Sequence, residues 1–293
     1  MSLASTVSNC SDIAADIDNF LAKPPLRVPL GIQSLDDALN GGISDEFLLV
    51  HGAAGMGKTD LLIFVISQLA ASRQIIFASY ELGRAQIVRR LLSALSATLE
   101  PEHALNESEL FDELNLSPEK RYLLGLTKNV FSQLASNLYI LDGALSSSVG
   151  AKHYTAGDLH SLANSMAEKS GSPPVLLVDY AQIVPVEGTS LLSTDAIDVT
   201  SRRLARIAHV EGVPTIALSS VSKNADVRGS SHLRHDADIV IRLDLDCVKS
   251  EKDAVMQHDK RPLLLHIEKN RNGRSGQSVP VMYRPAIHHF GSW

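Results

Sequence analysis

A short glycine-rich motif constrains the fold of this chain more than any other feature. The motif reads G-x-x-x-x-G-K-T, and an apolar run of strand length, residues 46–50, precedes it. An almost wholly apolar run of helical length, residues 60–69, follows it. In that context the pattern folds around the phosphates of a nucleotide, because backbone N–H groups and the helix N-terminus face the anion. The predicted phosphate loop consists of Gly52, Ala53, Ala54, Gly55, Met56, Gly57, Lys58 and Thr59.

Two residues of this loop are expected to carry chemistry. Lys58 would reach the β- and γ-phosphates of ATP, and the hydroxyl of Thr59 would bind Mg²⁺. The alternative is a glycine turn that leads into an ordinary helix. The flanking strand and helix favour nucleotide binding.

Two carboxylates are expected to join the loop. Asp179 directly follows the apolar run 175–178, and Glu81 ends the β-rich run 74–81, which is expected to form a strand. Ligands of open α/β sheets collect outside the carboxyl ends of the strands, where both side chains would arrive. We expect Asp179 to hold Mg²⁺ and Glu81 to orient and deprotonate the attacking water. The alternatives are a helix cap for Asp179 and a surface role for Glu81.

Strand-like and helix-like segments alternate along the chain. Further strands are expected at residues 138–142, 214–219, 239–243, 263–267 and 279–283. Helices are expected at 84–100 and 155–171, and the acidic, proline-bounded residues 101–120 are expected to form a solvated insertion of helical turns. This alternation predicts an α/β fold, a mostly parallel sheet with helices on both faces.

Composition narrows the class of protein. The 293 residues, 44% of them hydrophobic, suffice for one large α/β core, and no stretch approaches the roughly 18 uncharged apolar residues of a membrane span. With two cysteines and no signal-peptide pattern, a reducing cytoplasm is expected. The net charge of −6 argues against an extensively basic surface but allows a local basic site. His288 and His289 lack companion ligands, so no metal beyond the Mg²⁺ of the nucleotide is expected.

Five motifs occur in the order known from one family. Residues 30–36 with the glycines at 41–42 lead into the loop motif at 55–59, and the motif S-Y-E-L follows at 79–82. V-D-Y-A-Q stands at 178–182 and K-N-R-N-G at 269–273. From about Leu30 to the C-terminus, the chain resembles the motor domain of the DnaB family of replicative hexameric helicases. The resemblance implies a RecA-like P-loop NTPase core that uses ATP and Mg²⁺, and it is poorest over residues 101–130.

The resemblance also implies roles for residues that the nucleotide motifs alone do not identify. In the family, the Lys and Arg of the last motif reach the γ-phosphate held by the neighbouring subunit, so Lys269 and Arg271 are expected to act in trans, Arg271 as the arginine finger. From the residues alone, the segment is a basic hairpin turn between two strands, and both readings can hold together. Gln182 is expected among the nucleotide-binding residues. The chain departs from the family at Ser220, where the family usually has a Gln that senses the γ-phosphate.

The N-terminal region is expected to stand apart from the ATPase domain. Apolar residues recur at helical spacing over 12–22, and a Lys-Pro-Pro sequence ends the pattern. This short amphipathic helix could cover its own domain or dock on a neighbouring subunit, and the family's linker helix favours docking. We therefore expect a linker helix and proline linker at 1–28 and a RecA-like ATPase domain at 29–293. The primase-binding N-terminal domain of the family is not expected here.

A local excess of basic residues is expected to contact DNA. Residues 201–235 contain six Lys or Arg and two Asp or Glu. Lys223, Arg228, Gly229 and Ser230 resemble the backbone-gripping element of the family. Such groups bind phosphates without reading sequence, and no base stacking is expected because the loop lacks aromatic residues. The alternative is a solvated basic loop that touches nothing.

The sequence therefore favours a Mg²⁺-dependent ATPase motor that assembles as a homo-oligomer, a hexameric ring, around single-stranded DNA and meets other replication proteins. One alternative is a RecA/KaiC-like ATPase that hydrolyses ATP for switching or assembly without translocation. Another is an adaptor of a replication complex that binds ATP without turning it over. Ser220 and the missing N-terminal domain favour these alternatives, whereas the K-N-R-N-G motif favours the helicase.

Overall fold

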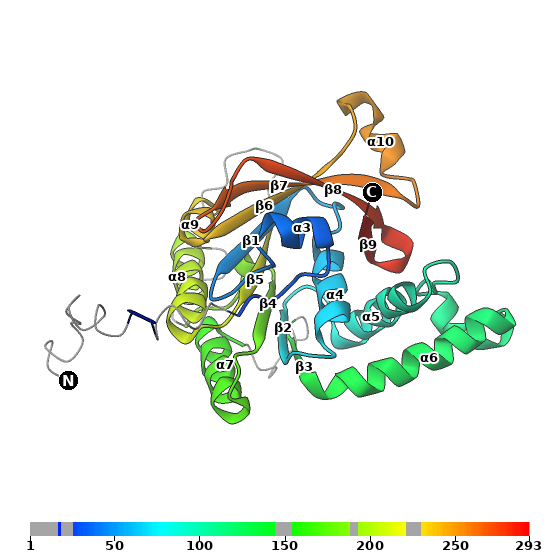
Figure 1. Cartoon of the computed structure of the whole chain (residues 1–293), viewed down its shortest axis with the longest axis horizontal. Helices are drawn as coiled ribbons and strands as arrows, with labels where there is room; N and C mark the ends of the chain where they lie inside the picture. Colours follow the sequence, from blue (N-terminus) through cyan, green and yellow to red (C-terminus); the bar gives the residue numbers. More distant parts are fainter. Residues whose placement is uncertain (1–16, 19–25, 144–153, 188–192, 221–229, 293) are drawn as a thin grey trace, which may run out of the picture.

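A single twisted sheet forms the centre of the molecule (Figure 1). The computed structural model describes residues 17–18, 26–143, 154–187, 193–220 and 230–292. The strands run in the order β3-β2-β4-β5-β1-β6-β7-β8-β9. From β3 to β6 neighbouring strands are parallel, and β7, β8 and β9 add to the edge of β6 in antiparallel pairing. Their bounds are β1 Phe47–Gly52, β2 Ile75–Ser79, β3 Leu138–Asp142, β4 Val175–Asp179, β5 Thr215–Ser220, β6 Ile239–Leu245, β7 Arg261–Asn270, β8 Gln277–Arg284 and β9 His289–Ser292.

Helices cover both faces of the sheet (Figure 1). One face packs against α4 (Lys58–Leu69), α5 (Arg84–Leu99) and the end of α6 (Pro118–Leu134). The other packs against α7 (Ala156–Ser170), α8 (Thr194–Glu211) and α9 (Ser230–Asp236). The short α3 (Gln33–Ala38) precedes β1, and α10 (Lys252–Val255) lies between β6 and β7. The central strands are buried on both sides, and this burial explains their continuous apolar runs.

The fold class expected from the sequence is confirmed, and several elements occur where their patterns predict them. The helix expected at 155–171 is α7, where Thr155 and Asp158 form a capping box and Gly171 ends the helix in the left-handed conformation. The acidic insertion contains two short 3-10 turns, Glu109–Phe111 and Glu113–Asn115. It is less solvated than expected, because Leu105 and Leu116 are buried against Leu124 of α6.

Other boundaries differ from expectation. The strand expected at 74–81 ends at Ser79, so Glu81 lies beyond β2. Helices α6 and α8 and strand β9 were not predicted individually. Most of the helix expected at 12–22 lies outside the described residues, and the domain boundary at residue 28 stays a prediction. Val28 pairs with Ile43 in an isolated antiparallel bridge.

None of the helices in the described part of the chain combines the length and the apolar character that crossing a membrane would require.

Candidate active site

The phosphate loop joins β1 to α4 in the arrangement that its sequence predicts. Gly55 and Gly57 have φ angles of +79° and +81°, which favour glycine. A Cβ atom at Gly57 would also lie 2.7 Å from the ring of Tyr283, and one at Gly52 would lie 2.7 Å from the carbonyl oxygen of Leu243. The glycines are therefore needed both for backbone conformation and for close packing.

Lys58 lies at the start of α4 and is 4% exposed. Its Nζ donates hydrogen bonds to the carbonyl oxygens of Gly52 at 2.8 Å and Ala53 at 2.9 Å. The ammonium group is therefore bonded to the backbone of the phosphate loop. Burial lowers the pKa of Lys58, while the nearby carboxylates of Asp179 and Glu81 act to raise it. The ammonium group lies among anionic groups and can exchange a carbonyl partner for a phosphate oxygen.

Thr59 and Asp179 meet although they are far apart in sequence. The Thr59 hydroxyl donates to one carboxylate oxygen of Asp179 at 3.0 Å. The other Asp179 oxygen is buried and has no hydrogen-bond partner among the described residues. Burial raises the pKa of Asp179 to about 7 despite the bond from Thr59. A hydroxyl beside an unpartnered buried carboxylate oxygen fits Mg²⁺, which prefers oxygen ligands and would restore the charged form.

Glu81 is exposed and lines a pocket of about 240 Å³. Burial, together with the nearby carboxylates of Asp179 and Glu81, raises the pKa of Tyr180. The pocket is lined by Gly55, Gly57, Lys58, Thr59, Asp60, Glu81, Leu82, Arg90, Tyr180 and Tyr283. The predicted base, the predicted phosphate lysine and the predicted Mg²⁺ hydroxyl thus share one pocket.

Gln182 lies beside the end of β5. Its Nε2 donates to the Ser219 hydroxyl at 2.7 Å and to the Ser220 carbonyl oxygen at 3.2 Å. Its Oε1 is buried and, within the described part of the chain, unpartnered. Gln182 therefore contacts the strand end at which the family's γ-phosphate sensor would stand, rather than the phosphate loop.

One group of residues beside the pocket was not predicted from the sequence. Asp60, next to Thr59, pairs with Arg90 at 2.9 Å and His288 at 3.0 Å and accepts a hydrogen bond from the Tyr283 hydroxyl. Burial acts to raise the pKa of Asp60, but the contacts with His288, Tyr283 and Arg90 lower it overall. These contacts hold Arg90 against the pocket. In the sequence, the one sign of this cluster is Asp60, an acidic residue in the first turn of a largely apolar helix.

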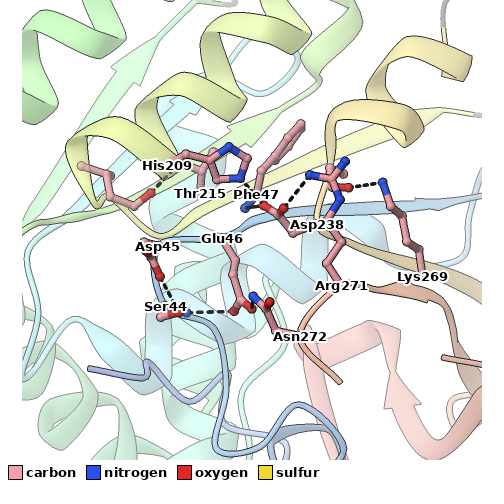
Figure 2. Close-up of polar contacts among 12 residues, drawn as sticks. Ser44, Asp45, Glu46, Phe47, His209, Thr215, Asp238, Lys269, Arg271 and Asn272 are labelled. Carbon is pink, nitrogen blue, oxygen red and sulfur yellow. Dashed lines mark hydrogen bonds and ion pairs between the residues drawn. The ribbon is translucent and has the colours of Figure 1, made fainter. Parts of the chain in front are cut away.

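The predicted trans-acting residues lie near the amino ends of β6 and β1, whereas the phosphate loop lies at the carboxyl end of β1. Figure 2 shows Lys269 and Arg271 at the end of β7. Lys269 Nζ donates to the carbonyl oxygens of Arg234 at 3.1 Å, His235 at 2.8 Å and Ala237 at 2.5 Å. The ammonium group therefore satisfies carbonyls at the C-terminal end of α9.

Arg271 follows Lys269 into the turn between β7 and β8, so the hairpin predicted from the basic sequence is confirmed. Its guanidinium pairs with Asp238 at 3.0 Å and donates to the His235 carbonyl oxygen at 3.1 Å. Arg271 and Lys269 thus belong to one well-anchored segment, separate from the pocket of the same chain.

Most of the residues predicted to bind DNA cannot be placed. Lys223, Arg228 and Gly229 lie outside the described residues, and Ser230 begins α9. Their role stays a prediction.

Comparison with known proteins identifies similar sequences. The family described as the DnaB-like helicase C-terminal domain matches residues 27–292. A replicative DNA helicase DnaB of Pasteurella multocida is 27% identical over 276 residues, covering 90% of this chain and 55% of that protein. A probable replicative DNA helicase of Trieres chinensis is 27% identical over 290 residues, covering 93% and 59%. The chain thus spans little more than half the length of these relatives.

Two solved structures support the fold. A solved ATPase domain has a TM-score of 0.76 at 20% identity and covers 98% of this chain and 99% of that one. A KaiC-like protein of Pyrococcus horikoshii has a TM-score of 0.58 at 18% identity and covers 92% and 100%. The RecA-like architecture extends over nearly the whole chain.

Proposed function

The chain belongs to the family of DnaB-like helicase C-terminal domains, and we propose that it is a Mg²⁺-dependent ATPase motor that works as a ring on single-stranded DNA. The observation that carries this proposal is that Lys58, Thr59 and Glu81 line one pocket, with Asp179 bonded to the Thr59 hydroxyl beneath it. Each residue has a distinct task there. Lys58 neutralises the phosphates, Thr59 and Asp179 hold Mg²⁺, and Glu81 orients the water that attacks the γ-phosphate.

Bound Mg²⁺ would supply charge stabilisation at the β- and γ-phosphates. The residues of the chain supply the geometry. Because Glu81 is exposed and Lys58 is buried in the same pocket, the base can meet solvent while the lysine remains shielded. An exposed base and a shielded phosphate-binding lysine suit attack of water on the γ-phosphate.

The position of Arg271 favours action on a neighbouring subunit. Asn270 pairs with Ile239, which is level with Leu48 on β1, whereas the phosphate loop begins at Gly52. Four residues of strand separate the two levels by about 13 Å along the sheet, and the intervening β6 adds to that distance. In this position Arg271 acts on the phosphate loop of another copy of the chain. The copies are then arranged head to tail and close into a ring.

Single-stranded DNA and replication proteins are the proposed partners. The relatives are named as replicative DNA helicases, and one solved DnaB-like helicase, with a TM-score of 0.74, is described together with its interactions with primase. Lys223, Arg228, Gly229 and Ser230 would contact the DNA backbone. A hexamer is the proposed oligomer.

DNA-stimulated ATP hydrolysis tests this function against its two alternatives. We expect wild-type protein with Mg²⁺ to hydrolyse ATP and to be stimulated by single-stranded oligonucleotides of unrelated sequence. Hydrolysis without stimulation or DNA binding would favour the switch ATPase. Nucleotide binding without turnover, with or without DNA, would favour the adaptor.

Mixing two inactive proteins tests the trans assignment. Lys58→Ala removes the phosphate lysine but keeps the finger, and Arg271→Ala does the reverse. Random assembly of equal amounts leaves about one quarter of the interfaces with both parts intact, so about that fraction of wild-type activity should return. Mixed oligomers that stay inactive would contradict the assignment.

A further inference from the structure

Asp238 is the carboxylate that forms an ion pair with Arg271. It lies between α9 and β6, and its side chain is 7% exposed. One of its oxygens accepts the Phe47 N–H at 2.9 Å and lies 2.5 Å from Nε2 of His209. The other oxygen accepts from Arg271 at 3.0 Å. Figure 2 shows His209 and Arg271 approaching Asp238 from different sides.

The backbone around Arg271 is fixed as well as its side chain. The Arg271 N–H donates to the Asp238 carbonyl oxygen at 3.0 Å. On the following residue, Asn272 donates from Nδ2 to Glu46 at 2.6 Å, and Glu46 is 2% exposed (Figure 2). The segment is therefore held by Asp238 at the arginine and by the buried carboxylate of Glu46 at the next residue.

The guanidinium is held without being enclosed. The Arg271 side chain is 45% exposed although it contacts both Asp238 and the His235 carbonyl oxygen. An arginine has several N–H donors in a rigid planar fork, so two contacts leave others for a further acceptor. A phosphate can meet the exposed side while the buried side keeps its partners.

We propose that Asp238 is a positioning residue for hydrolysis on the neighbouring subunit, orienting Arg271 before the nucleotide arrives. This inference rests on the proposed trans role of Arg271. Asp238 does not touch the nucleotide and acts only through the arginine. A preoriented guanidinium loses little conformational freedom on meeting the γ-phosphate, and misplacing such a group by about 1 Å can slow a reaction about a hundredfold.

Mixed rings test this proposal because they assign the two halves of an active interface to different proteins. The Lys58→Ala protein donates only the finger, and the Arg271→Ala protein donates only the phosphate loop. Adding Asp238→Asn to the finger donor should lower the recovered ATPase activity about tenfold or more. Adding it to the loop donor should leave the recovered activity within about twofold, because that protein's own finger is already absent.

Asp236→Asn is the matched control. Asp236 ends α9 close to Asp238 but contacts Ser201 and His235 rather than Arg271, so this change should leave both mixtures unaltered. Asn at position 238 retains an acceptor for the Phe47 N–H. Thermal melts of each protein check folding. If Asp238→Asn does not fold, Asp238→Glu serves instead, since it keeps the charge but displaces the carboxylate.

Each outcome decides the question. A loss confined to the finger donor supports the positioning role. Equal losses in both placements indicate a structural role and overturn it, as does full activity with the substitution in the finger donor. If the mixture with native Asp238 recovers no activity while wild type hydrolyses ATP, the trans role of Arg271 fails, and this inference fails with it.

Discussion

His289 should make the free energy of unfolding depend on pH, and the substitution His289→Phe should remove its contribution. This residue begins β9 and packs edge-on against Phe64 of α4, with ring centroids 5.2 Å apart. Burial, helped by the charge of Arg284, lowers the pKa of His289 from 6.5 to about 4. The folded state therefore favours the neutral ring. The unfolded chain binds a proton below about pH 6.5.

The sign and size of the effect follow from that difference. Between about pH 4 and 6.5 the unfolded chain holds more protons than the folded chain, so stability rises with pH in this window. At about 1.4 kcal/mol for each tenfold change in proton affinity, the total is roughly 3 kcal/mol. His289→Phe keeps an aromatic ring against Phe64 and removes the titrating group.

Urea unfolding of both proteins at several pH values from 4 to 7.5 measures the difference. The free energy of unfolding of wild type, relative to His289→Phe, should fall by about 3 kcal/mol from the highest to the lowest pH. Comparison with the variant cancels the contributions of the other histidines, including His51, whose pKa burial also lowers. A difference that does not vary with pH would refute the reasoning.

Three further predictions concern the proposed motor. Glu81→Gln should bind a fluorescent ATP analogue normally but hydrolyse ATP about a hundredfold more slowly, and turnover at the wild-type rate would exclude Glu81 as the base. Ser220→Gln should raise DNA-stimulated ATP hydrolysis, because the end of β5 would regain a side chain able to sense the γ-phosphate; unchanged stimulation would mean that this strand does not face the phosphate. Arg228→Ala should weaken single-stranded DNA binding equally for unrelated sequences and flatten its salt dependence by about 0.7 in log–log slope, as measured by fluorescence anisotropy. A sequence-dependent loss would contradict backbone contact.

The nucleotide pocket could be predicted largely from local sequence. A glycine loop needs only its flanking strand and helix, and Asp179 follows a run whose apolar character predicts a buried strand. Because parallel strands end at the same edge of a sheet, the meeting of Thr59 with Asp179 follows from topology alone. The fold class follows from the same alternation of buried strands and helices.

Contacts made by the antiparallel end of the sheet could not be predicted in this way. Asp60 meets Tyr283 and His288 only because β8 and β9 bring them against α4, and no periodicity specifies that register. The anchor of Arg271 on Asp238 likewise depends on how β7 pairs with β6, where the ladder is irregular beside Val240. Helix α6 was missed because its buried positions are few and an acidic segment precedes it.

The contact between Gly57 and Tyr283 makes the order of synthesis matter for nucleotide binding. The ring that fits against Gly57, and whose hydroxyl holds Asp60, is made more than 200 residues after the phosphate loop. A nascent chain that exposes β1 and α4 lacks this wall of the pocket, so it should bind nucleotide weakly while on the ribosome. Affinity should appear late, once β8 and β9 have emerged and packed. Binding of ATP then indicates that the domain has finished folding, and it does not direct the folding.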